Sequence, residues 1–575
     1  MKEPAILLDG PSADNDSVAS VLEFFGVPFQ RLSPAEWIRD AGNMPPARVF
    51  APANVFLELI GIAEKTTDGI SFWQNRIYAA FVFASGDVRP LEQLLERLEK
   101  RRVDIPRERA ETNWQVSDRF PELCGAVNGI KVTSRNPGLQ MVLEEVRLTD
   151  AGIIVGKNGA AFAKLNFKNV PVFLSTTRVI DIHCRLNSRN FDIRDHFLSA
   201  APVVMFVKWA FPETCFQPEE TSACLIIDDP PLKPRYGFLN FQTLNDLMAR
   251  CHFTSSVAFI PWNWRRSDSR IIELFRNNPD RFSISVHGCD HTQAEFGIQN
   301  GGRLHWKVDC ATRRMKRHES RTGLTHDSVM VFPQGVFSET AMRALKGSNF
   351  VGVVNSEVIS VGPEPGTIRI SDFWNVAVMN YHSFPIFTRR YPWQGLENFA
   401  FDILLGKPCI AVVHHNDCHD DCRHVAGFME TLNRLNARLV WRSLGDVVRR
   451  SFRRRELSAN VAEIDMFGKE LLLENSGNQK KYFCVRKTES APEQIKEVRA
   501  GNRTMAWTTI RSGVAFQTEV EPHSGQMIRI VYHEFSQNGF PGENLPHRFN
   551  AALRRYLCEF RDNYVMRKSF SQSPS

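Results

Sequence analysis

Short apolar runs that alternate with helical segments constrain the fold of this chain most strongly, and they are clearest between residues 220 and 456. Segments of helical spacing, such as Phe241–Arg250 and Ser338–Leu345, lie between the runs. Repeated strand-then-helix units of this length predict buried parallel strands in a (β/α) barrel or an open sheet. The apolar runs are Ala223–Ile227, Ser256–Ile260, Ser283–Val286, Val329–Phe332 and Cys409–Val413.

Regions of a different character flank this one in a chain of 575 residues, which is too long for one ordinary domain. Residues 1–125 alternate strand-like and helix-like segments, which predicts a flavodoxin- or Rossmann-like α/β domain. Residues 126–215 are mainly β in pattern and predict an extension or bracing segment. Short alternating segments at 460–535 predict a β-sandwich-like domain, and 536–575 predict a C-terminal helix and a frayed tail.

Charge and hydropathy exclude several classes of protein. The formal net charge is +7 and its cations are spread along the chain, which argues against a nucleic-acid binder. The basic run Arg449–Arg455 predicts the solvated end of a helix, with a phosphate or lipid-headgroup contact as the second interpretation. The N-terminus lacks a secretory pattern, and the apolar run Ala201–Phe211 contains Lys208. We therefore expect a cytoplasmic protein without a transmembrane segment, and mostly reduced thiols.

Two adjacent carboxylates, Asp228 and Asp229, come directly after the first apolar run of the central region. Burying both is costly unless something compensates their charge. A metal ion would compensate it and would also separate their roles, because one carboxylate can bind the ion while its neighbour accepts a proton. The alternative is a solvated pair that opens a loop.

Two histidines, His287 and His291, lie four residues apart after the third apolar run. Their side chains can converge on one ion if the chain turns or becomes helical there. Two imidazoles and one carboxylate form a usual catalytic zinc set, which leaves a position open for water. Such a pair taken alone is more often incidental, but it is more specific downstream of an Asp-Asp strand end.

Two further strand ends carry polar groups. The first is the turn that contains Pro333 and Gln334. At the second, His414 and His415 follow the last apolar run, and histidine has a suitable pKa for proton transfer near neutrality. We favour His414 as the acid because it directly follows the run, and a hydrogen-bonded structural histidine is the alternative. The loop up to His424 also contains cysteines that suit a second metal site or a redox pair, although a polar loop is the simpler interpretation.

The order of these motifs resembles that of the polysaccharide deacetylases, the NodB-homology or carbohydrate esterase family 4 superfamily. The motifs are Asp-Asp, H-x3-H, a Pro-containing turn and a late strand-end histidine. The flanking sequence, His287-Gly288-x-x-His291 followed by Glu295-Phe296-Gly297, resembles a little-characterised multidomain branch. The resemblance covers residues 220–450 and implies a distorted parallel (β/α) barrel of the deacetylase type.

The resemblance implies a role for each matching residue. Asp229, His287 and His291 would bind a divalent metal ion, most often Zn²⁺ in such a set, and Asp228 would be the catalytic base. His414 or His415 would be the general acid, and we favour His414.

Two features depart from the family pattern. The Asp that orients the acid matches Asp372 of Asp372-Phe373-Trp374 only loosely. The family has an arginine just before the proline of its third motif, whereas here Phe332 precedes Pro333. Losing such a partner of the base commonly costs 10–100-fold in activity or metal affinity.

The sequence therefore predicts a hydrolase of carbon–nitrogen bonds other than peptide bonds, which deacetylates N-acyl (or O-acyl) groups of a carbohydrate or polysaccharide. We expect Pro333, Gln334, Tyr236 and Trp264 to contact the substrate. Tyr236 ends a basic loop after the Asp pair, and an exposed Trp264 would stack on a sugar ring, although a core position is the alternative for it.

The alternatives to this activity are a glycoside or amide hydrolase on a similar barrel, and a catalytically impaired barrel. The impaired barrel would act as a carbohydrate-binding or scaffold module in polysaccharide biosynthesis. The flanking regions are available to orient a polymer, recruit a partner or form an oligomer.

Overall fold

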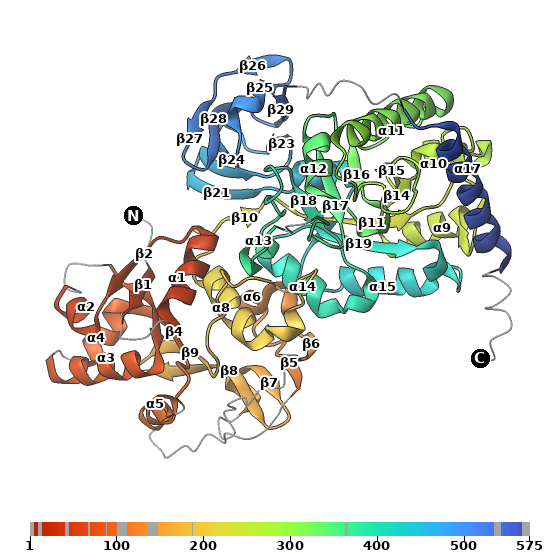
Figure 1. The fold of residues 1–575 in the computed structure, drawn as a ribbon. Coiled ribbons are helices and arrows are strands. Elements are labelled where there is room, and N and C mark those ends of the chain that lie inside the picture. Colours follow the sequence, from red (N-terminus) through yellow and green to blue (C-terminus); the bar gives the residue numbers. More distant parts are fainter. Residues whose placement is uncertain are drawn as a thin grey trace.

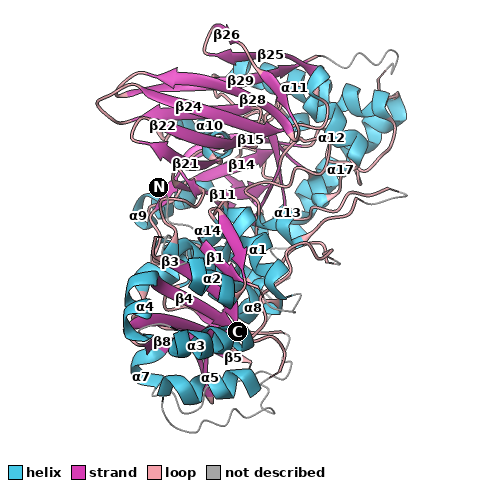
Figure 2. Cartoon of the chain, turned by 90° about the vertical axis from the view of Figure 1, so that its left-hand side faces the viewer, coloured by secondary structure: helices cyan, strands magenta, loops and turns pink. Residues whose placement is uncertain are grey.

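A computed structural model of the chain describes residues 5–9, 14–40, 45–66, 69–87, 89–99, 112–135, 148–186, 188–362, 366–533 and 542–565. The described chain forms an N-terminal α/β region, a central barrel and a β-sandwich-like region beside the barrel (Figure 1). Seen from the side, the N-terminal sheet and the sandwich lie at opposite ends of the molecule (Figure 2). The described part of the chain contains no helix that is long and apolar enough to cross a membrane.

The N-terminal region is built on one mixed sheet, in the order β2-β1-β3-β4-β9-β8-β7-β5-β6. Strands β1 to β4 and β9 pair in parallel, and the rest pair antiparallel. Residues 126–215 thus add strands to the sheet that residues 1–125 begin. The strands are β1 (Ala5–Leu8), β2 (Phe29–Leu32), β3 (Ala47–Pro52), β4 (Ile77–Phe83), β5 (Asn113–Val116), β6 (Lys131–Thr133), β7 (Gly152–Gly156), β8 (Gly159–Phe167) and β9 (Val170–Ser175).

Helices cover both faces of this sheet because each has an apolar face. In α5, for example, Leu91, Leu94 and Leu95 are buried at helical spacing. Helix α8 is apolar on every side and contains most of the run Ala201–Phe211, and it is buried in the protein. The helices are α1 (Asp14–Phe25), α2 (Pro34–Asp40), α3 (Ala53–Thr66), α4 (Gly69–Arg76), α5 (Arg89–Glu99), α6 (Pro121–Cys124), α7 (Leu148–Ala151) and α8 (Phe197–Ala210).

The central region is a nearly closed barrel of parallel strands in the order β18-β17-β16-β15-β14-β11-β19, and β20 also pairs with β11. Arg390 bridges the remaining gap, because its backbone hydrogen bonds to Ile410 and Val412 of β19. The strands are β11 (Thr221–Asp228), β14 (Ser255–Phe259), β15 (Phe282–His287), β16 (Val329–Val331), β17 (Gly352–Asn355), β18 (Ile386–Thr388), β19 (Cys409–His414) and β20 (Leu439–Trp441).

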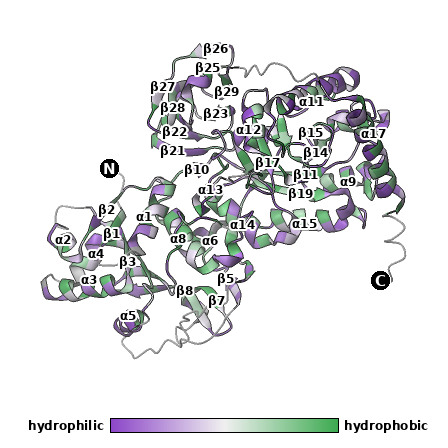
Figure 3. Cartoon of the chain, viewed as in Figure 1, coloured by the Kyte–Doolittle hydropathy of each residue, from purple (hydrophilic) through white to green (hydrophobic). Residues whose placement is uncertain are grey.

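Amphipathic helices surround the barrel, and Figure 3 shows hydrophilic residues along the outward helix α11 and hydrophobic ones along β11, β14 and β15. A hairpin of β12 (Arg235–Tyr236) and β13 (Leu239–Asn240) lies between β11 and α9. The helices are α9 (Phe241–Cys251), α10 (Ser269–Asn277), α11 (Gly301–Thr322), α12 (Glu339–Lys346), α13 (Ile370–Trp374), α14 (Leu396–Leu405), α15 (Arg423–Asn433) and α16 (Leu444–Arg450).

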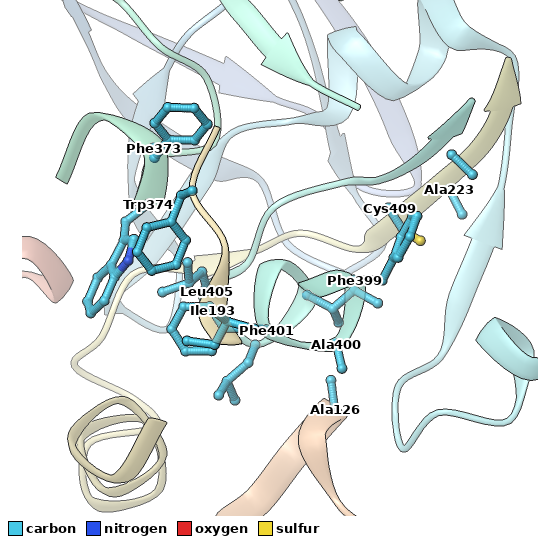
Figure 4. Packing of buried hydrophobic residues seen from close by; sticks show 14 of the residues in the cluster. Ala126, Ile193, Ala223, Phe373, Trp374, Phe399, Ala400, Phe401, Leu405 and Cys409 are labelled. Atoms are coloured by element: carbon cyan, nitrogen blue, oxygen red, sulfur yellow. The ribbon is translucent and has the colours of Figure 1, made fainter. Parts of the chain in front are cut away.

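The N-terminal region and the barrel share one hydrophobic core. Figure 4 shows Ala126 and Ile193 from the N-terminal part close to Phe401 and other residues of α14. The barrel is thus held against its neighbour by continuous apolar packing, which makes the two parts one packed unit.

The β-sandwich-like region consists of two sheets around a shared apolar core. One has the order β10-β21-β22-β24-β28-β27 and the other β23-β29-β25-β26. The strands are β10 (Gln217–Pro218), β21 (Arg453–Ser458), β22 (Val461–Met466), β23 (Glu470–Asn475), β24 (Lys481–Thr488), β25 (Ile495–Ala500), β26 (Arg503–Met505), β27 (Thr508–Ile510), β28 (Gly513–Val520) and β29 (Ser524–Tyr532). With the barrel and the N-terminal α/β region, this arrangement confirms the predicted fold class.

The basic run Arg449–Arg455 does not form a solvated helix end, so that interpretation was wrong. Arg449 pairs with Glu470 at 2.8 Å, and Arg450 pairs with Glu474 at 2.6 Å. Because these carboxylates belong to β23, the arginines join helix α16 of the barrel to the sandwich.

Helix α17 (Leu545–Phe560) ends the described chain with a further turn at Arg561–Val565. It lies across the barrel on the side away from the sandwich (Figure 1). Its apolar residues face outward: Leu545 is 76% exposed and Phe549 is 67% exposed. The helix therefore contacts the barrel mainly through its polar face.

Candidate active site

The carboxyl ends of neighbouring barrel strands bring the predicted residues together. Asp228, the last residue of β11, pairs in register with His414, the last residue of β19. His287 ends β15, and its register partner Val331 ends β16. Because parallel strands end at the same edge, residues distant in sequence meet at one mouth of the barrel, where (β/α) barrels place active sites.

Asp229, His287 and His291 form the tightest polar cluster at this mouth. Asp229 Oδ1 lies 3.3 Å from His287 Nε2 and 2.9 Å from His291 Nε2. One ligand atom from each side chain falls within 4.8 Å of the others. Asp229 and His291 both have a positive φ, of 80° and 55°. This left-handed backbone turns both side chains toward the cluster, and Asp and His adopt it more readily than most residues other than glycine.

The cluster has the donors and the orientation that a divalent cation needs. Asp229 Oδ1 is buried and faces a ring nitrogen of each histidine. His287 Nδ1 lies 3.0 Å from the carbonyl oxygen of Val331, so Nδ1 carries the proton and Nε2 is left to bind a metal. Burial alone would raise the pKa of Asp229, but the two imidazoles outweigh it and hold that pKa well below its usual value.

A glycine and a buried carboxylate shape the loop between the two histidines. Gly288 has φ of 63°, and a Cβ there would lie 2.1 Å from Glu295 Oε1. Glu295 accepts hydrogen bonds from the backbone N–H groups of Cys289, at 2.9 Å, and of His291, at 3.0 Å. The carboxylate thus fixes the turn that directs His291 at the cluster, with the amine of Lys307 3.4 Å away as its counter-charge.

Asp228 has a partner that the sequence analysis missed. The guanidinium of Arg389 donates hydrogen bonds of 2.7 Å to each oxygen of the Asp228 carboxylate. Both side chains are buried, with 3% and 2% exposed. Burial alone would raise the pKa of Asp228, but the charge and hydrogen bonds of Arg389 outweigh it, with help from His287, so the pKa is lowered. Asp228 is therefore held as an ionised carboxylate.

Arg389 is an arginine partner of Asp228, which the family pattern places just before the residue that corresponds to Pro333. It follows strand β18 in the sequence Arg389-Arg390-Tyr391-Pro392, so an arginine-rich segment does precede a proline, but on another strand. The signal in the sequence was the presence of two arginines directly after the apolar residues of β18.

The two candidate acids have different partners. His414 Nε2 lies 3.5 Å from the hydroxyl of Tyr391, and its ring is beside Asp228 because the two residues are in register. His415 points elsewhere: its Nε2 lies 3.3 Å from Asp562 Oδ2, in the turn after α17. His414 is thus the histidine that lies closer to the base.

The structure brings some of the other predicted residues to the site. Tyr236 is buried, and its hydroxyl donates a 2.7 Å hydrogen bond to Asp562. Pro333 packs against Gly288, so it adjoins the metal-binding loop. Gln334 accepts a 3.0 Å hydrogen bond from the backbone of Ala294, at the rim of the same loop.

Two predicted residues are bound elsewhere. Asp372 accepts hydrogen bonds from the backbone N–H of Arg369, at 2.7 Å, and from Asn380, at 3.0 Å, so it caps helix α13. The ring of Trp264 lies under the guanidinium of Arg265 at 4.4 Å. Neither has a described hydrogen bond or ion pair to Asp229, His287 or His291. Tyr391 occupies the position next to His414 that we expected for Asp372.

The C-terminal helix contributes groups to the site that the sequence analysis did not foresee. Glu559 of α17 pairs with Lys233 and Arg266, on the loops after β11 and β14. Asp562 joins Tyr236 and His415. Burial alone would raise the pKa of Asp562, but its hydrogen bonds outweigh this and lower that pKa to about 2. The helix is thus tied to the mouth by charged groups.

The loop after β19 contains a disulfide. Cys418 and Cys422 are bonded to each other, whereas the other ten described cysteines are free. Among the described residues, the only group of histidines, cysteines and acids with metal-binding geometry is the cluster of Asp229, His287 and His291.

Comparison with known proteins gives matches in structure alone. No protein-family model matches the chain, and no curated protein matches it. A similar solved structure is the carbohydrate deacetylase Agd3, with 9% sequence identity and a TM-score of 0.44, covering 92% of this chain and 98% of that one.

Other matches cover a smaller share of this chain. A polysaccharide deacetylase from Mycobacterium smegmatis, described as putative, has 12% identity and a TM-score of 0.28 over 40% of this chain and 92% of that one. The peptidoglycan N-acetylglucosamine deacetylase Bc1960 has 13% identity and a TM-score of 0.26 over 40% of this chain and 90% of that one. These three structures are described as deacetylases, and a further similar structure is described as a family 4 carbohydrate esterase from Streptomyces lividans.

Proposed function

We propose that this protein is a metal-dependent hydrolase that removes an N-acyl, or an O-acyl, group from a carbohydrate or polysaccharide. One observation carries the proposal: an ionised carboxylate, Asp228, lies beside a cluster with metal-binding geometry, Asp229, His287 and His291. A binding module has no physical need for a buried base next to such a cluster, whereas hydrolysis needs both groups.

Each side chain has a task in the proposed reaction. A divalent cation, for which Zn²⁺ suits the donor set, supplies Lewis-acid chemistry when bound: it acidifies water and polarises a carbonyl oxygen. Asp228 takes the proton of the attacking water, and Arg389 keeps its two oxygens in place for this. His414 gives a proton to the leaving amine or alcohol. Tyr391 orients the imidazole of His414 from the other side.

The substrate would enter over the loops that surround these groups. Tyr236 and Pro333 lie next to the cluster and are our candidates for contacts with the sugar, together with Gln334 at the rim. Because Arg265 lies over the ring of Trp264, we expect Trp264 to contact only a longer oligosaccharide substrate.

The second candidate function is a catalytically impaired barrel that binds carbohydrate or acts as a scaffold. Its main support in the sequence was the lack of an arginine beside Pro333. The bidentate pairing of Arg389 with Asp228 removes that support, because the base does have its partner. We therefore favour the enzyme.

Metal analysis and acetate release test the proposal on the same samples. We expect one divalent ion per purified chain, and release of acetate from N-acetylated amino-sugar oligomers. Asp229→Ala and His287→Ala should lose both metal and activity. Asp228→Asn should keep the metal and lose activity by about 10²–10⁴-fold, the usual contribution of a general base.

Asp421→Asn is the matched control. This exposed carboxylate lies in the loop after β19, outside the cluster of Asp229, His287 and His291. It should leave both readouts unchanged. A wild-type protein that binds no metal in stoichiometric amount, or an Asp228→Asn variant as active as the wild type, would overturn the proposal.

A further inference from the structure

Helix α17 is fixed over the active site at several points along its length. Arg303 of α11 pairs with Glu543, just before the helix, at 2.9 Å. Lys233 and Arg266 pair with Glu559 near its end, and the backbone N–H of Gly237 donates a 2.8 Å hydrogen bond to Asn563. These contacts hold the helix in one register, so the side chains on its inner face have defined positions at the mouth of the barrel.

The inner face places an arginine, Arg555, beside a residue of the metal-binding cluster. Arg555 is only 7% exposed. Its Nη2 lies 3.4 Å from His291 Nδ1 and 3.6 Å from the sulfur of Cys558, and its Nε has no hydrogen-bond partner among the described atoms. No described carboxylate forms an ion pair with it, although buried charges in proteins are ordinarily paired.

The acids that follow Arg555 in the chain and those beside His291 are bound to other groups. Glu559 is held by Lys233 and Arg266, and Asp562 is held by His415, Tyr236 and Arg561. Asp290, beside His291, pairs with Arg314 at 2.5 Å and with Lys307 at 3.4 Å, and Asp229 faces His287 and His291. Because each of these acids has another partner, the guanidinium of Arg555 keeps hydrogen-bond donors for an anion that comes from outside the chain.

The contact with His291 indicates where that anion would lie. A guanidinium can only donate hydrogen bonds, and Nη2 of Arg555 lies 3.4 Å from His291 Nδ1. The other ring nitrogen of His291, Nε2, faces Asp229 at 2.9 Å. An anion bound to Arg555 would therefore lie on the Nδ1 side of the His291 ring, beside the cluster of Asp229, His287 and His291.

We propose that Arg555 is the substrate-recognition residue of this site and that it binds an anionic group of the acylated sugar. The chemical class is an oxyanion with two or more terminal oxygens, such as the carboxylate of a uronic acid or a phosphate ester, because a guanidinium pairs with such groups through two parallel hydrogen bonds. This inference rests on the proposed function and adds to it the charge of the substrate. It also assigns a role to the C-terminal helix, which carries the residue.

Anion binding to metal-free protein tests the proposal separately from catalysis. D-glucuronate, D-glucose and inorganic phosphate are titrated by calorimetry into full-length protein treated with a chelator. The wild type should bind glucuronate and phosphate, but not glucose. Arg555→Gln should weaken the binding of both anions about tenfold or more, the effect of losing a charge-assisted hydrogen bond. Binding of glucuronate alone assigns the site to a uronic acid, and binding of phosphate alone assigns it to a phosphate ester.

Two further variants control the test. Arg548→Gln removes the same charge from an exposed position of the same helix and should bind the anions as the wild type does. Arg555→Lys keeps the positive charge but lacks the parallel N–H donors of a guanidinium, so it should retain part of the affinity. A thermal unfolding curve establishes that each variant is folded before it is titrated.

The outcomes separate this inference from the proposed function. Wild-type protein that binds neither anion, or Arg555→Gln that binds them as tightly as Arg548→Gln, would overturn the role of Arg555, whatever the acetate assay shows. Anion binding that depends on Arg555 in a protein without metal or acetate release would support the recognition site while the hydrolase proposal fails.

Discussion

Replacing Arg389 by methionine should reduce both stability and activity, because it removes the partner of a buried carboxylate. Arg389 and Asp228 are 2% and 3% exposed, and two hydrogen bonds of 2.7 Å join them. Breaking a buried ion pair by removing one partner costs about 3–5 kcal/mol. A carboxylate without its orienting partner typically also loses about 10–100-fold in activity.

The neighbouring residue provides a matched control. Arg390 is also buried and pairs with Asp402 through contacts of 2.6 and 3.2 Å, but successive residues point to opposite faces of the barrel wall. Arg390→Met should therefore lower the free energy of unfolding by a similar amount. Its kcat/KM per folded molecule should remain close to that of the wild type, because Asp402 lies outside the site.

Urea unfolding followed by circular dichroism gives the stability, and acetate release well below the unfolding midpoint gives kcat/KM. A double variant, Arg389→Met with Asp228→Asn, should recover part of the lost stability because it leaves no uncompensated buried charge. Equal losses of kcat/KM in Arg389→Met and Arg390→Met would refute the reasoning, since the loss would then follow from general destabilisation and not from the position of the base.

Three further predictions concern a buried histidine, the turn at Gly288 and the C-terminal helix α17. Burial lowers the pKa of His318 to about 4 from its usual 6.5, so the folded state binds fewer protons than the unfolded chain between these values. The free energy of unfolding should therefore fall by up to about 3 kcal/mol as the pH is lowered through this range. Urea unfolding at the upper and the lower pH of the range measures this fall, and it should be smaller in His318→Gln. Gly288→Ala should cost about 1–3 kcal/mol and weaken zinc binding, since its Cβ would lie 2.1 Å from a Glu295 oxygen. Gly61→Ala, inside helix α3 with open space around it, should leave zinc binding unchanged and raise the free energy of unfolding by about 0.5–1 kcal/mol in the same titrations. Glu559→Gln should speed hydrogen exchange in α17 without changing that of α11, and unchanged exchange would show that its ion pairs do not hold the helix.

The barrel and the meeting of Asp229, His287 and His291 at its mouth could be predicted because both depend on local patterns. Each strand is an apolar run, and each predicted ligand or base follows or ends such a run within a few residues, as Asp228, Asp229 and His287 do. Parallel pairing then places strand ends together without further information. The register of Asp228 with His414 is the consequence.

Arg389 could not be predicted in this way because its role depends on a distant partner. It is separated from Asp228 by 161 positions. The family pattern directed the search to Pro333, whereas the barrel places the required guanidinium at the end of β18. The sequence contains one sign of this partner: a pair of arginines directly after a buried strand needs acidic partners, and the structure supplies them in Asp228 and Asp402.

Helix α17 shows a different limit of sequence reasoning. Its large apolar residues recur at helical spacing, at Leu545, Phe549 and Leu553, and such a stripe ordinarily predicts the buried face. The structure buries Ala551 and Arg555 instead and exposes the stripe. Ion pairs with loops far away in the sequence determine which face is turned inward, and a local pattern contains no information about them.

The three buried arginines near the barrel mouth can be compared by their partners. Arg389 and Arg390 each form a bidentate pair with a carboxylate of the chain, so the desolvation of each charge is offset within the protein. Arg555 is buried to a similar degree with only an imidazole and a thiol as neighbours. Arg389 and Arg390 show that this protein compensates a buried guanidinium with a carboxylate. We therefore expect Arg555 to take its anion from solution. That anion would bind at the entrance to the proposed catalytic centre.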